Sequence, residues 1–315
     1  MRYIISFLLT STAALAEVPS VVTDIPPVQS LAAAVMEGVG EPQMLLGKGA
    51  SPHSYELKPS QALAISEADL LVWVGPQLTP WLDKALDIRL ETATLLTLID
   101  VEATYRQDFG ASGEHDHEAE DHDHDGAEAE AGHDEGHDHS HTGLDPHAWL
   151  DPANGKVWAR AIAAELSRLD PENAAAYAAN AEKAVAAIDA ADAEAAALLA
   201  PVKDKPYVAF HDAYGYFSGH YGLTSAGTVA LGDAAMPGAQ RLTELRAKIQ
   251  AGGVVCIFPE AQHDPALVAQ MAEGTGIRVG AVLDPSGSAG ETGPAAYPAL
   301  LTNLARAMAD CLSGS

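Results

Sequence analysis

The 315-residue sequence has few basic residues, few cysteines and no long apolar run. It holds 17 Lys and Arg against 44 Asp and Glu, which gives a formal net charge of −27. A nucleic-acid-binding protein needs basic residues to neutralise phosphates, so this charge argues against that class and favours cations as ligands. A transmembrane helix needs about 20 consecutive apolar residues, and no segment of the sequence is that long.

The first 16 residues have the pattern of a secretory signal peptide. Arg2 is followed by an apolar run over residues 3–9 and by small residues that end in Ala14-Leu15-Ala16. A charged start, an apolar middle and an A-x-A end are typical of such peptides. We therefore expect cleavage near Ala16 and a mature protein that is soluble outside the cytoplasm.

Only two cysteines occur, Cys256 and Cys311. In an oxidising compartment an even pair predicts a disulfide bond. The alternative is a pair of unrelated buried thiols, because free cysteine is also a common core residue.

Short apolar strands alternate with helical segments in both halves of the chain. This order predicts an α/β protein in which helices cover parallel sheets. The expected domains are an N-terminal α/β domain over 17–170 and a C-terminal α/β domain over 201–315. The expected strands lie at 18–23, 44–46, 70–74, 94–99, 207–210, 224–229, 254–258 and 277–283.

Residues 171–200 are expected to form a long helix that links the two domains. Asp170-Pro171 provides a helix start, residues 172–200 contain 16 alanines and no glycine, and Pro201 ends the segment. The alternative is two shorter helices in one bundle.

Residues 111–142 interrupt the α/β pattern. They hold twelve acidic residues and eight histidines, with no Lys or Arg. Such a segment cannot bury apolar surface, so we expect a disordered loop that binds additional metal weakly. Its histidines are His115, His117, His122, His124, His133, His137, His139 and His141.

Three other histidines stand beside turn residues or strand ends. His53 follows Ser51-Pro52, His147 follows Asp145-Pro146, and His211 follows the expected strand at 207–210. Ligands of open α/β sheets bind at the carboxyl ends of strands, and neutral imidazoles are common zinc ligands. His220 lies in a helical pattern and His263 in a loop, and we expect both to be surface residues.

The sequence resembles the zinc-uptake branch, the ZnuA type, of the metal-specific periplasmic binding proteins of ABC transporters. The motifs are Pro52-His53-Ser54-Tyr55, Asp145-Pro146-His147-Ala148-Trp149-Leu150-Asp151-Pro152, Phe210-His211-Asp212-Ala213-Tyr214 and Val279-Gly280-Ala281-Val282-Leu283-Asp284-Pro285. They occur in the family's order and span nearly the whole mature chain. The resemblance implies two chelatase-like α/β domains, a rigid linking helix, and a Zn²⁺ ion bound between the domains by His53, His147 and His211.

The fourth ligand is left open by the resemblance. Asp284 occupies a position that is a carboxylate ligand in many family members. In zinc-branch members water or a neighbouring acidic residue can complete the coordination sphere instead. Asp284 could instead be a helix-capping residue before Pro285. Asp145 and Asp151 are expected to be turn and helix-cap residues. The resemblance also supports a Cys256–Cys311 disulfide.

The resemblance implies a monomeric periplasmic protein that captures zinc and delivers it to the membrane permease of an ABC importer, and it leaves open a periplasmic zinc chaperone. Imidazole-rich sites suit zinc better than manganese, which prefers oxygen ligands. The alternatives are a manganese or other divalent-metal binding protein of the same family, and a metal buffer built around residues 111–142. A zinc hydrolase is disfavoured because the sequence has no H-E-x-x-H or G-x-S-x-G motif.

Overall fold

The computed structural model describes residues 18–110, 143–230 and 237–314. The expected signal peptide and the expected loop at 111–142, with its eight histidines, lie outside the described residues. Within the described residues no helix is long and apolar enough to cross a membrane.

The first half of the chain forms a four-stranded parallel sheet in the order β2-β1-β3-β4. Its central strand β3 is a run of four buried apolar residues, as expected for a strand covered on both faces. The elements of this half are β1 (Val21–Thr23), α1 (Pro26–Val35), β2 (Gln43–Met44), α2 (Pro59–Glu67), β3 (Leu70–Trp73), α3 (Pro80–Asp83), β4 (Thr94–Thr97), and 3₁₀ turns at Leu86–Ile88, Leu98–Asp100 and Ala148–Leu150.

The second half forms another four-stranded parallel sheet, in the order β6-β5-β7-β8. The two-sheet α/β fold predicted from the sequence is therefore confirmed. The elements of this half are β5 (Tyr207–Ala209), α6 (Gly215–Tyr221), β6 (Ser225–Thr228), α7 (Ala239–Gln250), β7 (Cys256–Ile257), α8 (Pro265–Ala272), β8 (Arg278–Val279) and α9 (Ala296–Ser313).

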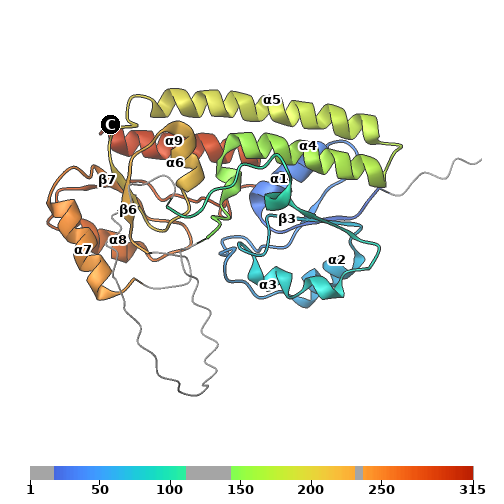
Figure 1. The fold of residues 1–315 in the computed structure, drawn as a ribbon, viewed down its shortest axis with the longest axis horizontal. Helices are drawn as coiled ribbons and strands as arrows, with labels where there is room; N and C mark the ends of the chain where they lie inside the picture. The colour runs from blue at the N-terminus through green and yellow to red at the C-terminus, as the bar shows by residue number, and fades with distance from the viewer. Residues whose placement is uncertain (1–17, 111–142, 231–236, 315) are drawn as a thin grey trace, which may run out of the picture.

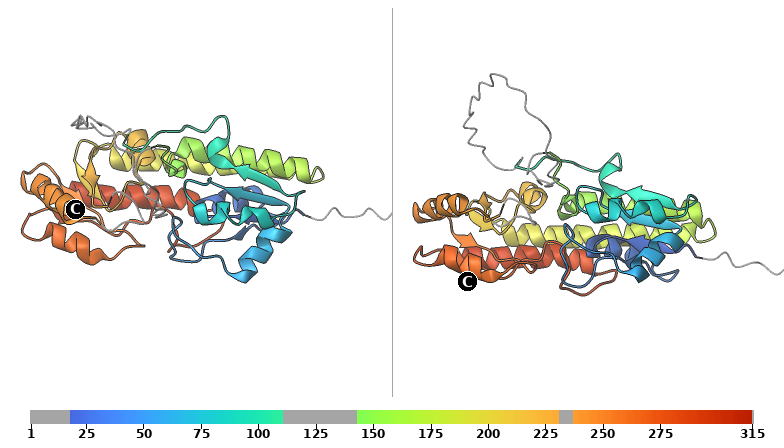
Figure 2. Two further views of the ribbon diagram at one scale, coloured as in Figure 1. Left: turned by 60° about the horizontal axis from the view of Figure 1, so that its bottom comes forward. Right: turned by 90° about the horizontal axis from the view of Figure 1, so that it is seen from below.

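Three long helices form a layer that covers both halves (Figure 1). They are α4 (Pro152–Leu169), α5 (Ala174–Leu199) and α9, and α5 packs against both α4 and α9. The alanine-rich segment is one continuous helix of 26 residues, about 39 Å long, rather than two shorter ones. Figure 2 shows this layer from two further sides, with a lobe at each end of it.

The strands are shorter than the sequence pattern suggests. The expected strand at 277–283 contributes only Arg278–Val279 to the sheet, and Leu283 returns as an isolated bridge to Glu260. The helix α3 is a single α-helical turn, Pro80–Asp83, and a 3₁₀ turn follows it. Short apolar runs do not by themselves specify where pairing with a neighbouring strand stops, so these boundaries differ.

Covalent and polar contacts hold the second lobe to the helical layer and to the first lobe. The predicted disulfide is confirmed and joins Cys256 in β7 to Cys311 in α9. The Trp149 indole donates to the Pro285 carbonyl at 2.8 Å, and the Tyr297 hydroxyl donates to the Trp149 carbonyl at 2.6 Å. These buried contacts fix the loop after residue 283 against the segment that contains His147.

Asp24 is a buried carboxyl at the carboxyl end of β1. Its oxygens accept hydrogen bonds of 2.8 Å from the backbone N–H groups of Ile25 and Val74. Burial raises the pKa of Asp24 to about 7, although these two hydrogen bonds act in the opposite direction. The folded protein therefore holds a proton on Asp24 at pH values where the unfolded chain has lost it.

This proton makes the metal-free protein lose stability as the pH rises from about 4 to about 7, because the unfolded chain ionises near pH 3.9. Asp24→Asn should remove that part of the pH dependence, whatever its effect on absolute stability. Urea unfolding of the metal-free variant and parent at pH 5 and pH 7.5 measures the difference. Asp69→Asn, which removes an exposed carboxylate beside the same sheet, is the matched control. An unchanged pH slope in Asp24→Asn would contradict the buried-proton assignment.

Candidate metal site

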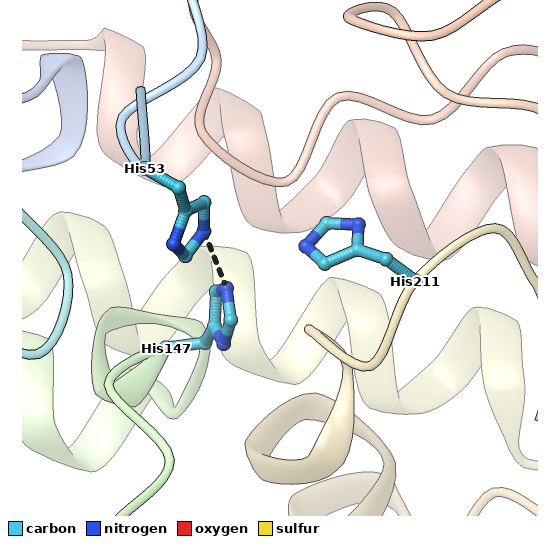
Figure 3. A group of neighbouring side chains, drawn as sticks. All are labelled: His53, His147 and His211. Atoms are coloured by element: carbon cyan, nitrogen blue, oxygen red, sulfur yellow. Dashed lines mark hydrogen bonds between the residues drawn. The ribbon is translucent and has the colours of Figure 1, made fainter. Parts of the chain in front are cut away.

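His53, His147 and His211 lie together between the two lobes (Figure 3). Their ligand atoms are all within 4.8 Å of one another. The Nε2 atoms of His53 and His147 are 3.3 Å apart, which matches the separation of two ligands on one tetrahedral zinc with bonds of about 2.0–2.1 Å. The structure therefore brings together the three histidines that the sequence selected.

The backbone around each histidine explains why the rings converge. His211 follows β5 at its carboxyl end, where polar side chains of parallel sheets gather. His147 precedes the 3₁₀ turn that leads into α4, whose N-cap is Asp151. His53 lies in the loop between β2 and α2. The Trp81 indole holds this loop through a 2.7 Å hydrogen bond to the Pro52 carbonyl.

A buried carboxylate fixes the orientation of His147. Asp145 Oδ1 lies 2.7 Å from His147 Nδ1 and also accepts a hydrogen bond from the His147 backbone N–H. Asp145 is 1% exposed and His147 is 2% exposed. With its proton on Nδ1, His147 presents the Nε2 lone pair to the other two histidines, as a metal ligand requires. Asp145 thus acts as more than the turn residue expected from the sequence.

Glu260 has the same role at His211, and sequence reasoning missed it. Glu260 Oε2 hydrogen-bonds His211 Nδ1, and Glu260 Oε1 accepts from the His211 backbone N–H at 3.3 Å. Glu260 follows β7, the strand next to β5, so the two residues meet at one sheet edge although 49 positions separate them. The available signal was an acidic residue just beyond a buried strand.

Asp284 lies outside this histidine cluster in the part of the chain that the structure describes. Its oxygens accept hydrogen bonds from the backbone N–H groups of Ser288 and Ala289 at 3.2 and 2.8 Å. Gln262 Nε2 donates to Asp284 Oδ1 at 3.1 Å. Asp284 thus organises the loop over 284–289 and does not cap a helix, because the next helix, α9, begins only at Ala296.

The space between the three histidines is small. The cavity has a volume of about 10 Å³, enough for one water-sized sphere. Gln262 and Ser286 line it together with the histidines. The space among the histidines is therefore the size of a single ion and too small for an organic substrate.

The two other described histidines differ from each other. His220 is at the surface, as expected, and its ring lies between Asp151 and Asp192 at 3.2 and 2.9 Å. The hydrogen bond to Asp151, opposed by partial burial, raises the His220 pKa above its usual value. His263, also expected at the surface, is instead half-buried and stacks on Phe210 with ring centroids 4.1 Å apart.

The chain is similar over nearly its whole length to known proteins of one family. Residues 21–311 match the family model described as the periplasmic component A of a zinc-uptake complex. The high-affinity zinc uptake system protein ZnuA of Paracoccus denitrificans is 54% identical over 303 residues, which cover 94% of this chain and 93% of that protein.

Solved structures show the same fold. A crystal structure of ZnuA superposes with a TM-score of 0.73 at 24% identity, covering 94% of this chain and all of that chain. The substrate-binding protein FpvC of Pseudomonas aeruginosa, in complex with Mn²⁺, gives a TM-score of 0.77 at 19% identity, covering 95% of this chain and 99% of that chain. At these identities the likeness supports the two-lobed fold alone.

Proposed function

The chain belongs to the family of periplasmic component A proteins of zinc-uptake complexes, and we propose that it captures one Zn²⁺ ion between its lobes and delivers it to the membrane permease of an ABC importer. The observation that carries the proposal is the convergence of His53, His147 and His211 within 4.8 Å of one another. The site's chemistry and charge support zinc as the cargo.

Three imidazoles form a donor set that zinc accepts readily and manganese does not favour. Asp145 and Glu260 fix the tautomers of two of them, and both carboxylates are buried beside the cluster. A dication placed among the histidines offsets these two buried negative charges. The donor set therefore favours zinc over the manganese alternative within the same family.

We propose water as the fourth ligand. Asp284 is held by the hydrogen bonds of its own loop, and in the described structure no carboxylate belongs to the group of three histidines around the cavity. Gln262 and Ser286, which line that cavity, can hydrogen-bond a zinc-bound water. An open water position also occurs in zinc enzymes, but a transport role fits the uptake names of the relatives.

The proposal has further features, two of which concern segments outside the described residues. Residues 1–16 direct export to the periplasm, and residues 111–142 collect additional zinc at weaker sites and pass it to the cleft. A chaperone that loads the site would act on the same route. The protein acts as a monomer with domains at 17–170 and 201–315, linked by the helix within 171–200.

The test is the zinc content and coordination of the purified mature protein. Calorimetry should show one tight zinc site, retained after deletion of 111–142, and weaker sites lost with that deletion. X-ray absorption of the one-zinc complex should count three imidazoles and one oxygen ligand. Manganese should bind more weakly. Loss of the tight site on deletion of 111–142 would support a metal buffer instead of a transport receptor.

A further inference from the structure

A second group of ligand atoms lies directly beside the three-histidine cluster. The ligand atoms of His211, Glu260 and His263 are within 4.8 Å of one another. Glu260 and His263 come from the segment that follows β7, and His211 belongs to both groups. The described structure thus places two potential metal positions on either side of one imidazole.

His263 is the outermost member of the second group. Its side chain is 17% exposed, compared with 5% for His211 and 0% for Glu260. Its ring stacks on Phe210 with an interplanar angle of 16°, and its Nε2 atom lies 4.0 Å from Glu260 Oε2. The stacking fixes the plane of the imidazole while its edge faces the buried carboxylate.

The donor set of this second group also suits zinc. Two imidazoles and one carboxylate form a common zinc set, and ligand atoms on one tetrahedral zinc are about 3.3 Å apart. Glu260 and His263 need to approach by less than about 1 Å to reach that separation. The hydrogen bond between Glu260 and His211 must lengthen, because a metal would take the place of its proton.

We propose that His211, Glu260 and His263 form a second zinc position, which shares His211 with the cleft and rests on the zinc-binding function proposed above. A neutral imidazole has one lone pair and one N–H. Zinc in the cleft binds Nε2 of His211 and leaves the proton on Nδ1, which donates a hydrogen bond to Glu260. Zinc in the second position takes Nδ1, and the same proton moves to Nε2.

The two positions therefore exclude each other at neutral pH. The cleft holds zinc more tightly because its histidines are already oriented and its cavity has the size of an ion, whereas the second position must first break the bond between His211 and Glu260. The more exposed His263 offers zinc a first ligand on a route that ends at the cleft. On this route zinc occupies the second position before it reaches the cleft.

The test removes the cleft ligands that the second position does not use. His53→Ala combined with His147→Ala leaves the second group complete, and adding His263→Phe removes its outer ligand while preserving a ring on Phe210. Calorimetry on both full-length proteins should show one more zinc bound to the double variant than to the triple variant. Residues 111–142 are identical in both proteins, so their contribution cancels.

A Co²⁺ titration gives an independent measurement. The visible spectrum of Co²⁺ in the double variant should change on His263→Phe, and His263→Gln should give the same change if the phenylalanine variant does not fold. The melting transitions of the metal-free proteins should agree within each comparison. Equal zinc stoichiometry and equal Co²⁺ spectra would overturn the second position. A double variant that binds zinc as tightly as the parent would instead overturn the cleft site.

Discussion

His147→Ala should abolish tight zinc binding. The substitution removes one of three ligands, so the loss should exceed the roughly 10–100-fold typical of changes to residues that only orient a ligand. His147 Nε2 lies 3.3 Å from His53 Nε2, and no other described residue offers a ligand atom at that place. Competition with a chromophoric chelator at pH 7.5 measures the dissociation constant for zinc when binding is too tight for direct calorimetric titration.

The substitution should also destabilise the metal-free protein, because Asp145 loses its hydrogen bond to the His147 ring while it remains buried. Losing a buried hydrogen bond to a charged group costs about 1.5–3 kcal/mol. Zinc affinity and metal-free unfolding must therefore be measured on the same preparations, so that loss of a ligand is separated from loss of structure.

His220→Ala is the matched control. His220 belongs to neither group of ligand atoms in the described structure, and its ring contacts Asp151 and Asp192 instead. At pH values below the raised His220 pKa, its removal should lower the stability of the protein, because the ring is protonated there and forms ion pairs with the two carboxylates. At pH values above that pKa, the removal should have little effect on stability. Zinc affinity should remain that of the parent. Equal affinities for zinc in His147→Ala, His220→Ala and the parent would refute the assigned site.

The fold was predictable where the sequence contains strong local signals. The alanine content between Pro171 and Pro201 predicts helix throughout, and of the two alternatives left open the structure has the single long helix. The buried run at 70–73 specifies a central strand. The length of the 277–283 strand was not predictable, because pairing there depends on β7 and on the turn that Asp284 organises.

The three proposed ligands were more predictable than the residues that orient them. His53, His147 and His211 each stand in a short motif beside a turn or a strand end. Glu260 has no such motif, and its role depends on the pairing of β5 with β7, which places it against His211. His263 was missed for the same reason, because its burial comes from Phe210 on the neighbouring segment.

Glu260→Gln should weaken zinc binding by about 10–100-fold while leaving the fold intact. An ionised glutamate can only accept a hydrogen bond from His211 Nδ1–H, so it enforces the tautomer whose Nε2 lone pair faces the cluster. Glutamine can either accept a hydrogen bond from Nδ1–H or donate one to an unprotonated Nδ1. In the second case His211 carries its proton on Nε2 and cannot bind the metal through that atom. The substitution also removes a buried negative charge that favours a dication.

The measurement separates this positioning role from a purely structural one. At saturating zinc, a 10–100-fold loss of affinity lowers the zinc-dependent gain in unfolding free energy by about 1.4–2.7 kcal/mol. The exposed Glu244→Gln on α7 removes the same charge away from the site and should keep the whole gain. A structural role would lower the melting temperature of the metal-free protein and leave the zinc-dependent gain unchanged. That outcome would show that the His211 tautomer is set without Glu260.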